Sequence, residues 1–247
     1  MSTQIPYISL QNSTNLLHHN ESAIALLSGD QQSKNKTHLL ARTMSGRFSS
    51  IEEVEGKDLH SFLKRLGTAK SVQAKFLLVL GFSKKCFTGV ANALTAGTKR
   101  AEVAKQSSST KYPMVLLAAN AYLNQPTSGH LKSLFLALKT NPETSTYRRD
   151  LLHRFLNVLR IHIDGKGETL SDAANLYQKE MRHTGRPISH RKLIGTTLLV
   201  KGLEYDHAVI LDADALDAKD LYVAMTRGSK SLTIIGTCRY LPVRDDS

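Results

Sequence analysis

Tryptophan is absent from this 247-residue sequence, and aromatic residues make up only 6% of it. The two cysteines, Cys86 and Cys238, form neither a C-x-x-C pair nor a Cys/His cluster. This argues against a disulfide framework or a structural zinc site and favours a reducing compartment. The longest charge-free apolar run, Tyr112–Leu123, is about half the ~20 residues that a membrane-spanning helix needs. The N-terminus lacks the basic and apolar regions of a secretory signal, so we expect a cytoplasmic protein without membrane contact.

A phosphate-binding loop of the form G-x-x-x-x-G-K-[ST] is also missing. Such a loop cradles phosphates with backbone amides and neutralises them with its lysine. The two Gly-Lys pairs, at residues 56–57 and 165–166, are followed by Asp and Gly rather than by Ser or Thr. The histidines show no metal-ligand spacing, and Asp212 and Asp214 do not form a convincing magnesium pair. We therefore expect this chain to bind no metal by itself.

Positive charge is plentiful and unevenly distributed. The formal net charge is +12 at pH 7. Residues 51–190 hold 21 Lys and Arg against 11 Asp and Glu, whereas the other 107 residues hold 12 against 10. An excess confined to one segment favours contact with nucleic-acid phosphates. The alternative is a solvated basic surface that binds nothing acidic.

The N-terminal region predicts alternating strands and helices. Residues 6–10 form a β-like run, and residues 12–14 supply possible N-caps. Apolar residues at helical spacing predict a helix over residues 16–27, ended by the Ser-Gly-Asp sequence at residues 28–30. Residues 37–41 could form a second strand.

The middle of the chain is rich in leucine and alanine at helical spacing and is punctuated by breakers. We expect six or seven helices there, with predicted segments at residues 58–66, 72–82, 114–123, 131–139, 148–163 and 171–182.

The C-terminal region returns to alternating strands and helices. Strands are predicted at Lys192–Val200, His207–Leu211 and Leu232–Ile235. Between the last two, Asp217 is expected to cap a helix that ends before Gly228. Its expected apolar stripe comprises Ala218, Leu221, Tyr222 and Met225. The sequence thus predicts one α/β domain made of residues 1–50 and 188–247, interrupted by a basic helical insertion over residues 51–187.

Two stretches of the C-terminal region carry candidate chemistry. We call residues 196–206, TTLLVKGLEYD, the KGLE segment, and residues 221–228, LYVAMTRG, the arginine segment. Arg227 stands at the expected end of a helix, where it could serve as an arginine finger that stabilises charge developing on a transferred phosphoryl group. The alternative is an arginine that complements the dipole of its own helix at a solvated surface.

Together and in this order, the two segments resemble the fifth and sixth motifs of the UvrD/Rep/PcrA family of superfamily 1 DNA helicases. Those motifs read roughly T-x-H-x-x-K-G-L-E-[FY] and L-x-Y-V-[AG]-x-T-R-[AG]. The resemblance implies that the α/β domain is the RecA-like second motor domain, interrupted by a 2B-like helical insertion. Residues 7–12 faintly resemble the strand that opens this domain, with Asn12 matching and Leu10 replacing the usual arginine.

The resemblance also assigns roles in nucleotide binding. Arg227 would be the catalytic arginine finger. Glu204 would bond the ribose hydroxyl, Gly202 would let the backbone approach closely, and Lys201 and Thr226 would lie near ATP. The magnesium ion that accompanies ATP would come with the first motor domain.

A second set of residues is implicated in binding nucleic acid. By resemblance, Thr196 and Thr197 would contact the backbone of single-stranded DNA. Arg191 and Lys192, just before them, are plausible phosphate contacts, although a solvated charged face explains them equally well. The family's usual histidine is replaced by Leu198, which cannot donate a hydrogen bond.

These resemblances predict the C-terminal half of an ATP-dependent DNA helicase or translocase. Its partners would be single-stranded or unwinding DNA and a separate half that carries the phosphate-binding loop, so the chain alone should be inactive. The alternative is a non-catalytic module, derived from a helicase half, that binds DNA or protein. The polarity of movement and the choice between DNA and RNA stay open.

Overall fold

A computed structural model describes residues 21–29, 31–44, 47–51, 56–94, 112–184 and 191–237. The chain divides into two compact units: Met1–Glu52 with Ile188–Ser247, here called the sheet unit, and Glu53–Pro187, here called the helical unit. The predicted strand at residues 6–10, and Asn12 with it, lies outside the described residues. Within the described residues, no helix combines the length and apolar character needed to cross a bilayer.

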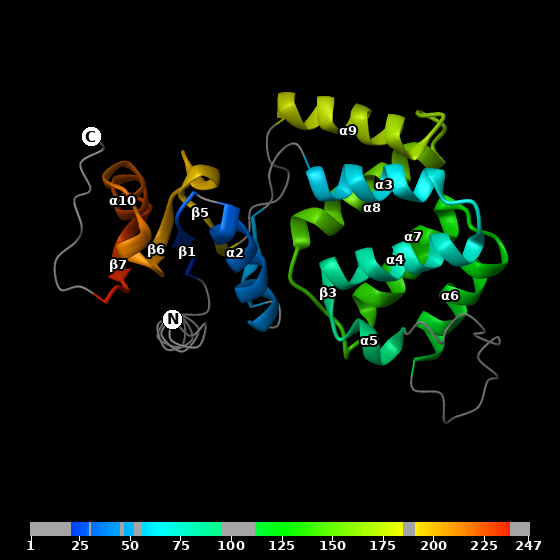
Figure 1. The fold of residues 1–247 in the computed structure, drawn as a ribbon, viewed down its shortest axis with the longest axis horizontal. Coiled ribbons are helices and arrows are strands. Elements are labelled where there is room, and N and C mark those ends of the chain that lie inside the picture. Colours follow the sequence, from blue (N-terminus) through cyan, green and yellow to red (C-terminus); the bar gives the residue numbers. More distant parts are fainter. Residues whose placement is uncertain are drawn as a thin grey trace. The chain divides into compact units, whose positions relative to one another are not determined.

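The sheet unit contains a five-stranded parallel sheet in the order β2-β5-β1-β6-β7. In chain order the strands are Ala23–Leu27 (β1), Ser49–Ser50 (β2), Lys192–Thr196 (β5), Tyr205–Ile210 (β6) and Gly228–Ile234 (β7). Figure 1 shows β1 between β5 and β6. The prediction of a mixed α/β fold built on a parallel sheet is therefore confirmed.

The central strand β1 corrects the prediction of a helix over residues 16–27. All five of its residues are buried, as expected for a strand covered on both faces of a parallel sheet. Ala23 pairs with Lys192 on one side and with His207 on the other. A run of five apolar residues cannot be assigned to a helix or a strand from its periodicity alone. Here the two partner strands determine its conformation.

The strand predicted at residues 37–41 is also wrong, because these residues belong to the helix α2, Gln31–Thr43. Thr37, Leu40 and Ala41 are buried along this helix, at the three- and four-residue spacing of a helix face. The helix packs against β1 and β5.

The C-terminal strands and helix lie close to their predicted positions. The strand β5 ends at Thr196, and the rest of the predicted strand forms a 3₁₀ turn over Thr197–Val200 (η2). A second 3₁₀ turn spans Ala213–Ala215 (η3). Asp217 caps the helix Ala218–Met225 (α10) by accepting a hydrogen bond from the Asp220 amide.

The predicted apolar stripe of α10 is only partly correct. Leu221 and Ala224 are buried, whereas Tyr222 is 70% exposed and Met225 is 39% exposed. The helix is short and covers the sheet with only its Leu221 and Ala224 side, so the neighbouring apolar positions face outward.

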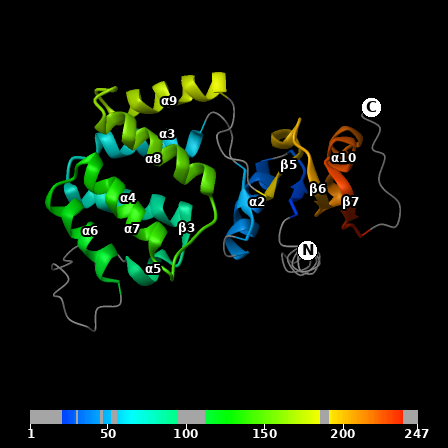
Figure 2. The ribbon, with the colours of Figure 1, turned by 180° about the vertical axis from the view of Figure 1, so that it is seen from behind.

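The helical unit is built from seven described helices and a short antiparallel pair of strands, Phe87–Thr88 (β3) with Ser145–Thr146 (β4). Each of the six predicted helical segments of the middle region coincides with a helix. The helices are Lys57–Thr68 (α3), Val72–Cys86 (α4), Val90–Ala93 (α5), Pro113–Asn124 (α6), Ser128–Thr140 (α7), Arg149–Ile163 (α8) and Leu170–Thr184 (α9). Seen from behind in Figure 2, α6 lies beside α7, and α8 beside α9.

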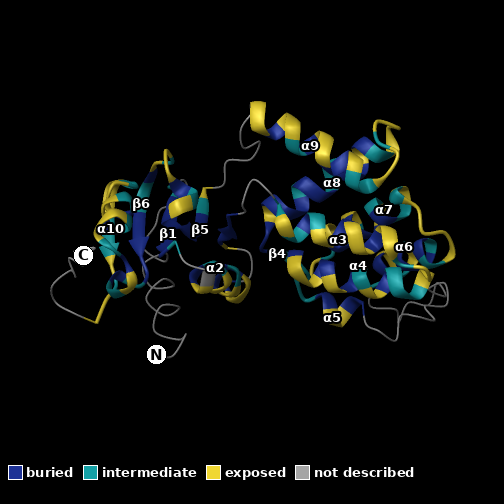
Figure 3. Cartoon of the chain, turned by 45° about the horizontal axis from the view of Figure 1, so that its top comes forward, coloured by how far each residue is buried: buried dark blue, intermediate teal, exposed yellow. Residues whose placement is uncertain are grey.

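Four phenylalanines form the centre of the helical unit's core. Phe62 stacks on Phe82 with ring centroids 4.0 Å apart, and Phe155 meets Phe82 and Phe135 edge to face. Figure 3 shows buried inner faces and exposed outer faces on these helices. Edge-to-face aromatic pairs add stabilisation beyond the area they bury, so this unit has a core of its own.

Candidate functional site

The carboxyl edge of the parallel sheet is where ligands usually bind in open α/β folds. Here β1 ends at Leu27 and β5 ends at Thr196, next to each other in the sheet. The amide of Gly29, just after β1, donates a hydrogen bond to Asp220 Oδ2 of α10 at 3.1 Å. This bond ties the end of the central strand to the first turn of the helix that leads to Arg227.

The KGLE segment starts at this edge, at the end of β5, and runs back to the opposite edge of the sheet, where β6 starts at Tyr205. Gly202 and Glu204 therefore lie near the amino end of β6. Gly202 has a φ of +80°, a left-handed conformation that glycine adopts without strain. A Cβ atom there would meet nothing within 4 Å, so the backbone faces open space. Lys201 and Glu204 are exposed on either side of it. In the part of the chain that the structure describes, neither side chain has a hydrogen-bonding partner.

The Arg227 side chain joins the two segments. Its Nη1 atom donates to the carbonyl oxygen of Leu203 at 2.9 Å, and its Nε atom donates to the carbonyl of Val223 at 2.9 Å. The Nη2 atom donates to the Thr226 hydroxyl at 2.9 Å. In addition, the Arg227 carbonyl accepts from the amide of Tyr205, the first residue of β6, at 2.9 Å. The arginine is therefore held beside the turn that carries Gly202 and Glu204.

This geometry agrees in part with the alternative role of Arg227, in which the arginine complements the dipole of its own helix. The bond to the Val223 carbonyl satisfies one of the last carbonyls of α10, as a basic residue at a helix C-terminus commonly does. A guanidinium has five N–H donors, and the three bonds described above occupy three of them. The other two have no acceptor among the described residues, so the half-buried side chain keeps donors for a ligand.

The Thr226 hydroxyl forms its hydrogen bonds within its own helix and with the adjacent Arg227. Its hydroxyl donates to the carbonyls of Tyr222 and Val223, both at 3.1 Å, and accepts from Arg227. It therefore fixes the arginine in place, and a contact with ATP would require this hydrogen bonding to change.

The four residues expected to grip nucleic acid do not lie together. Thr196 ends β5 and Thr197 begins η2. They are 1% and 0% exposed, and neither hydroxyl has a hydrogen-bond partner among the described residues. Arg191 and Lys192 stand at the other end of the same strand, about 13 Å away along it at the usual rise per residue. One phosphate group cannot touch both pairs, and the buried threonines are covered in this conformation.

Two further contacts escaped sequence reasoning. Asp220 holds Gly29, as described above. Asp206 Oδ2 accepts from the amide and the hydroxyl of Ser22, both at 2.8 Å, and its Oδ1 lies 3.1 Å from Lys230 Nζ. Both carboxylates bond to residues distant in the sequence, so no local pattern could have identified them.

Apolar side chains are exposed beside this site. Tyr222 and Met225 face outward on α10, and Leu198 is 53% exposed on η2, which packs against α10. Leu198 therefore adds an apolar side chain to the surface formed by Tyr222 and Met225.

Among the described residues, no cluster of three or more His, Cys, Asp and Glu side chains could hold a metal ion. Neither the known protein families nor the curated proteins gave a match to this chain.

Proposed function

We propose that this chain acts as the second motor half of an ATP-dependent DNA helicase or translocase, with a RecA-like sheet domain interrupted by a 2B-like helical domain. In such a motor, ATP binds between two halves, and opening and closing of the cleft moves single-stranded DNA. This chain would supply Arg227 to the γ-phosphate, and Glu204 and Gly202 to the ribose. The phosphate-binding loop and its magnesium would come from a partner chain or from another part of a longer protein.

The observation that carries the proposal is the hydrogen bond between Arg227 Nη1 and the Leu203 carbonyl. It places a planar cation beside the turn that carries the exposed Glu204 and the open backbone at Gly202. A cation that stabilises phosphoryl charge and a carboxylate that accepts from sugar hydroxyls are complementary to a nucleotide. Because three hydrogen bonds fix the guanidinium, it would be held in position before ATP arrives, as electrostatic catalysis requires.

The exposed apolar residues near this site fit a surface that closes against another domain. Tyr222 and Met225 lie on the same short helix that delivers the arginine. Tyrosine and methionine are enriched at protein interfaces. A helix that presents them beside an arginine finger would bury them when the cleft closes on ATP.

The rival proposal is a non-catalytic module that binds DNA or protein, in which Arg227 only caps α10. The three intramolecular bonds of Arg227 support this rival. The two proposals differ in what the loss of Arg227 should change: ATP turnover under the first, and stability alone under the second.

The deciding experiment measures DNA-stimulated ATP turnover by the chain alone and by its complex with a half that carries the phosphate-binding loop. We expect the chain alone to stay below ~1 s⁻¹, near the lower end of enzyme turnover. In the complex, Arg227→Ala should reduce turnover by ~10³-fold or more, the range that arginine fingers supply. Arg227→Lys should restore little, because an ammonium cannot reproduce the planar donor.

Arg47→Ala is the matched control, because Arg47 is exposed and belongs to the same unit. It should leave turnover unchanged. Thermal melting separates the structural part of the Arg227 effect, which we expect to cost about 1–3 kcal/mol for the lost hydrogen bonds. Turnover in the complex that changes less than about threefold on Arg227→Ala would favour the binding module.

A further inference from the structure

A pocket in the helical unit has the character of a binding site and belongs to none of the motifs above. It encloses a cavity of about 570 Å³, within the size range of small-molecule sites. Fifteen residues from six helices and the adjoining turns line it, and none of these described residues is acidic. In a chain with a net charge of +12, such a pocket is suited to an anion.

Two helices begin at this pocket. Ser128 and Gly129 are the first residues of α7, and Leu170 and Ser171 are the first residues of α9; all four line the cavity. The first amides of a helix have no partner within it and carry the positive end of its dipole. Among the described residues, the four amides have no acceptor. At the start of α9, the Asp172 carboxylate already accepts from the Thr169 amide and hydroxyl. The start of α7 is therefore the helix N-terminus that offers unpaired N–H groups to an anion in this cavity.

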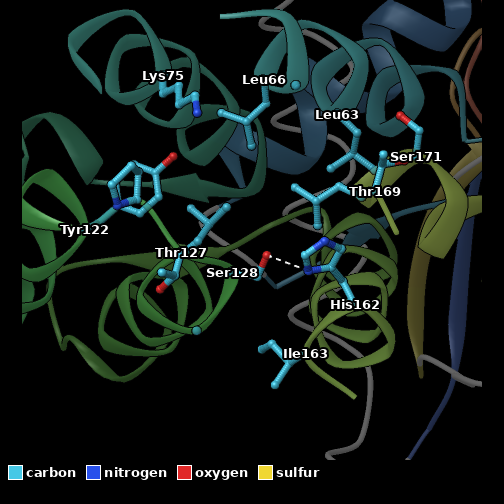
Figure 4. Close-up of a pocket in the computed structure, with 15 residues that line it drawn as sticks. Leu63, Leu66, Lys75, Tyr122, Thr127, Ser128, His162, Ile163, Thr169 and Ser171 are labelled. Carbon is cyan, nitrogen blue, oxygen red and sulfur yellow. Dashed lines mark hydrogen bonds between the residues drawn. The ribbon is translucent and has the colours of Figure 1, made fainter. Parts of the chain in front are cut away.

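Side chains from other helices add donors. Lys75 of α4 and Tyr122 of α6 both line the cavity, and Figure 4 shows the Lys75 ammonium and the Tyr122 hydroxyl on the same side of it. Tyr122 is only 2% exposed, yet its hydroxyl has no hydrogen-bond partner in the described structure. Burial raises the pKa of Tyr122 to about 12, so the hydroxyl keeps its proton at neutral pH and can donate.

The Tyr122 hydroxyl is thus a donor that a ligand in the cavity could use. His162 supports the same arrangement from α8. Its Nδ1 atom lies 3.0 Å from the Ser128 hydroxyl and so helps to hold the start of α7 (Figure 4).

The remaining lining is apolar and comes mainly from Leu63, Leu66, Leu131 and Ile163. A lone phosphate ion would leave this surface uncovered. An organic group attached to the anion would bury it and gain hydrophobic stabilisation. The lining therefore favours a ligand with an anionic head and an apolar or planar body.

We propose that this pocket binds a terminal phosphate monoester, with the phosphate at the start of α7 on the side of Lys75 and Tyr122, and the attached organic group against the leucines (Figure 4). Phosphate binding at helix N-termini follows from their unpaired amides and their dipole. The phosphate could belong to a small metabolite or to the 5′ end of a nucleic-acid strand. The site lies within the helical unit and does not depend on the role proposed for Arg227.

The test is isothermal titration calorimetry on the full chain at constant ionic strength. The probes are inorganic phosphate, phenyl phosphate, adenosine 5′-monophosphate, and one oligonucleotide with and without a 5′-phosphate. We expect phenyl phosphate to bind more tightly than inorganic phosphate, because it also covers the apolar wall. A preference for the 5′-phosphorylated oligonucleotide over both small esters would identify a strand end as the source, and tight binding of a small ester would identify a metabolite.

Two pairs of variants locate the binding. Lys75→Met should weaken it about tenfold or more, as expected for the loss of a charged hydrogen bond, whereas Lys139→Met, at the exposed far end of α7, should not. Ser128→Pro deletes one of the proposed amide donors at a position where helices tolerate proline. The preceding Thr127 already has the extended backbone, with φ −93° and ψ 160°, that proline requires.

Ser128→Ala is the matched control for the proline variant, since it removes the hydroxyl and its contact with His162 but keeps the amide. We expect the proline variant to bind more weakly than the alanine variant, with circular dichroism confirming that both are folded. The proposal fails if no phosphate ester binds at millimolar concentrations. It also fails if binding is the same in Lys75→Met and Lys139→Met, which would show that the ester binds elsewhere.

Discussion

Asp206 connects the starts of two neighbouring strands, because it is the second residue of β6 and bonds to Ser22, which precedes β1. The Ser22 amide and hydroxyl, together with the Lys230 ammonium, hold the pKa of this carboxyl well below its usual range. Each of these groups bonds better to the carboxylate than to the protonated acid. The carboxylate therefore stabilises the folded state as long as it stays ionised.

This gives a pH dependence with a definite sign. A lowered pKa in the folded state contributes stability that is present above the unfolded pKa of about 3.9 and is lost as the pH falls through the lower folded value. We expect Asp206→Asn to melt at a lower temperature than the wild type at pH 7. The gap should persist to about pH 4 and narrow below it. Melting curves recorded from pH 7 to pH 3 check this, and a constant gap over that range would contradict it.

At the scale of single elements, the predictability of this fold depends on where the specifying information lies. In the helical unit, the sequence of each helix itself contains the signals that specify it. Ser71 and Thr127 cap α4 and α7 by accepting bonds from amides three residues ahead, and α3 and α8 alternate buried and exposed positions at helical spacing. Such signals lie within a dozen residues and can be recognised in the sequence.

The central strand lacks any local signal of this kind. Its sequence, AIALL, suits a buried helix as well as a buried strand, and only the pairing with β5 and β6 decides between them. The site shows the same limitation. The sequence pattern singled out Arg227. The position of its side chain, however, depends on a hydrogen bond to the backbone carbonyl of Leu203, and no sequence pattern predicts that contact.

Because β1 is the central strand, we expect a single substitution in it to destabilise the sheet unit strongly. Leu26 is fully buried between the neighbouring strands. Leu26→Ala should destabilise the sheet unit by about 2–5 kcal/mol, the usual cost of truncating a buried leucine. Leu39→Ala on α2, where the side chain is 47% exposed, is the control and should cost about 0.5 kcal/mol or less.

Hydrogen exchange of the β5 and β6 amides measures both variants against the wild type, because those strands flank β1. We expect Leu26→Ala to accelerate exchange in both strands. Equal protection in the two variants would mean that β1 does not hold the sheet together.

At the scale of the whole molecule, the charge excess of residues 51–190 coincides closely with the helical unit. We expect this region to carry most of a weak affinity for single-stranded DNA. Neutralising several phosphates releases counterions, so affinity should fall roughly tenfold or more from low to physiological salt. Fluorescence anisotropy with a labelled oligonucleotide, for the full chain and for residues 51–190 alone, tests this. Binding that is insensitive to salt, or absent from residues 51–190, would contradict it.

The parallel sheet also affects the order in which this chain can fold. The strand β1 pairs only with β5 and β6, which follow the entire helical unit in the sequence. On the ribosome, the helices emerge first and can bury their phenylalanine core. At that stage β1 is already synthesised, but β5 and β6, with which it pairs, are not. Contacts between segments so far apart in the sequence form slowly. During synthesis, the apolar residues of β1 are thus the segment that most needs protection from aggregation, by a chaperone or by the nascent protein itself.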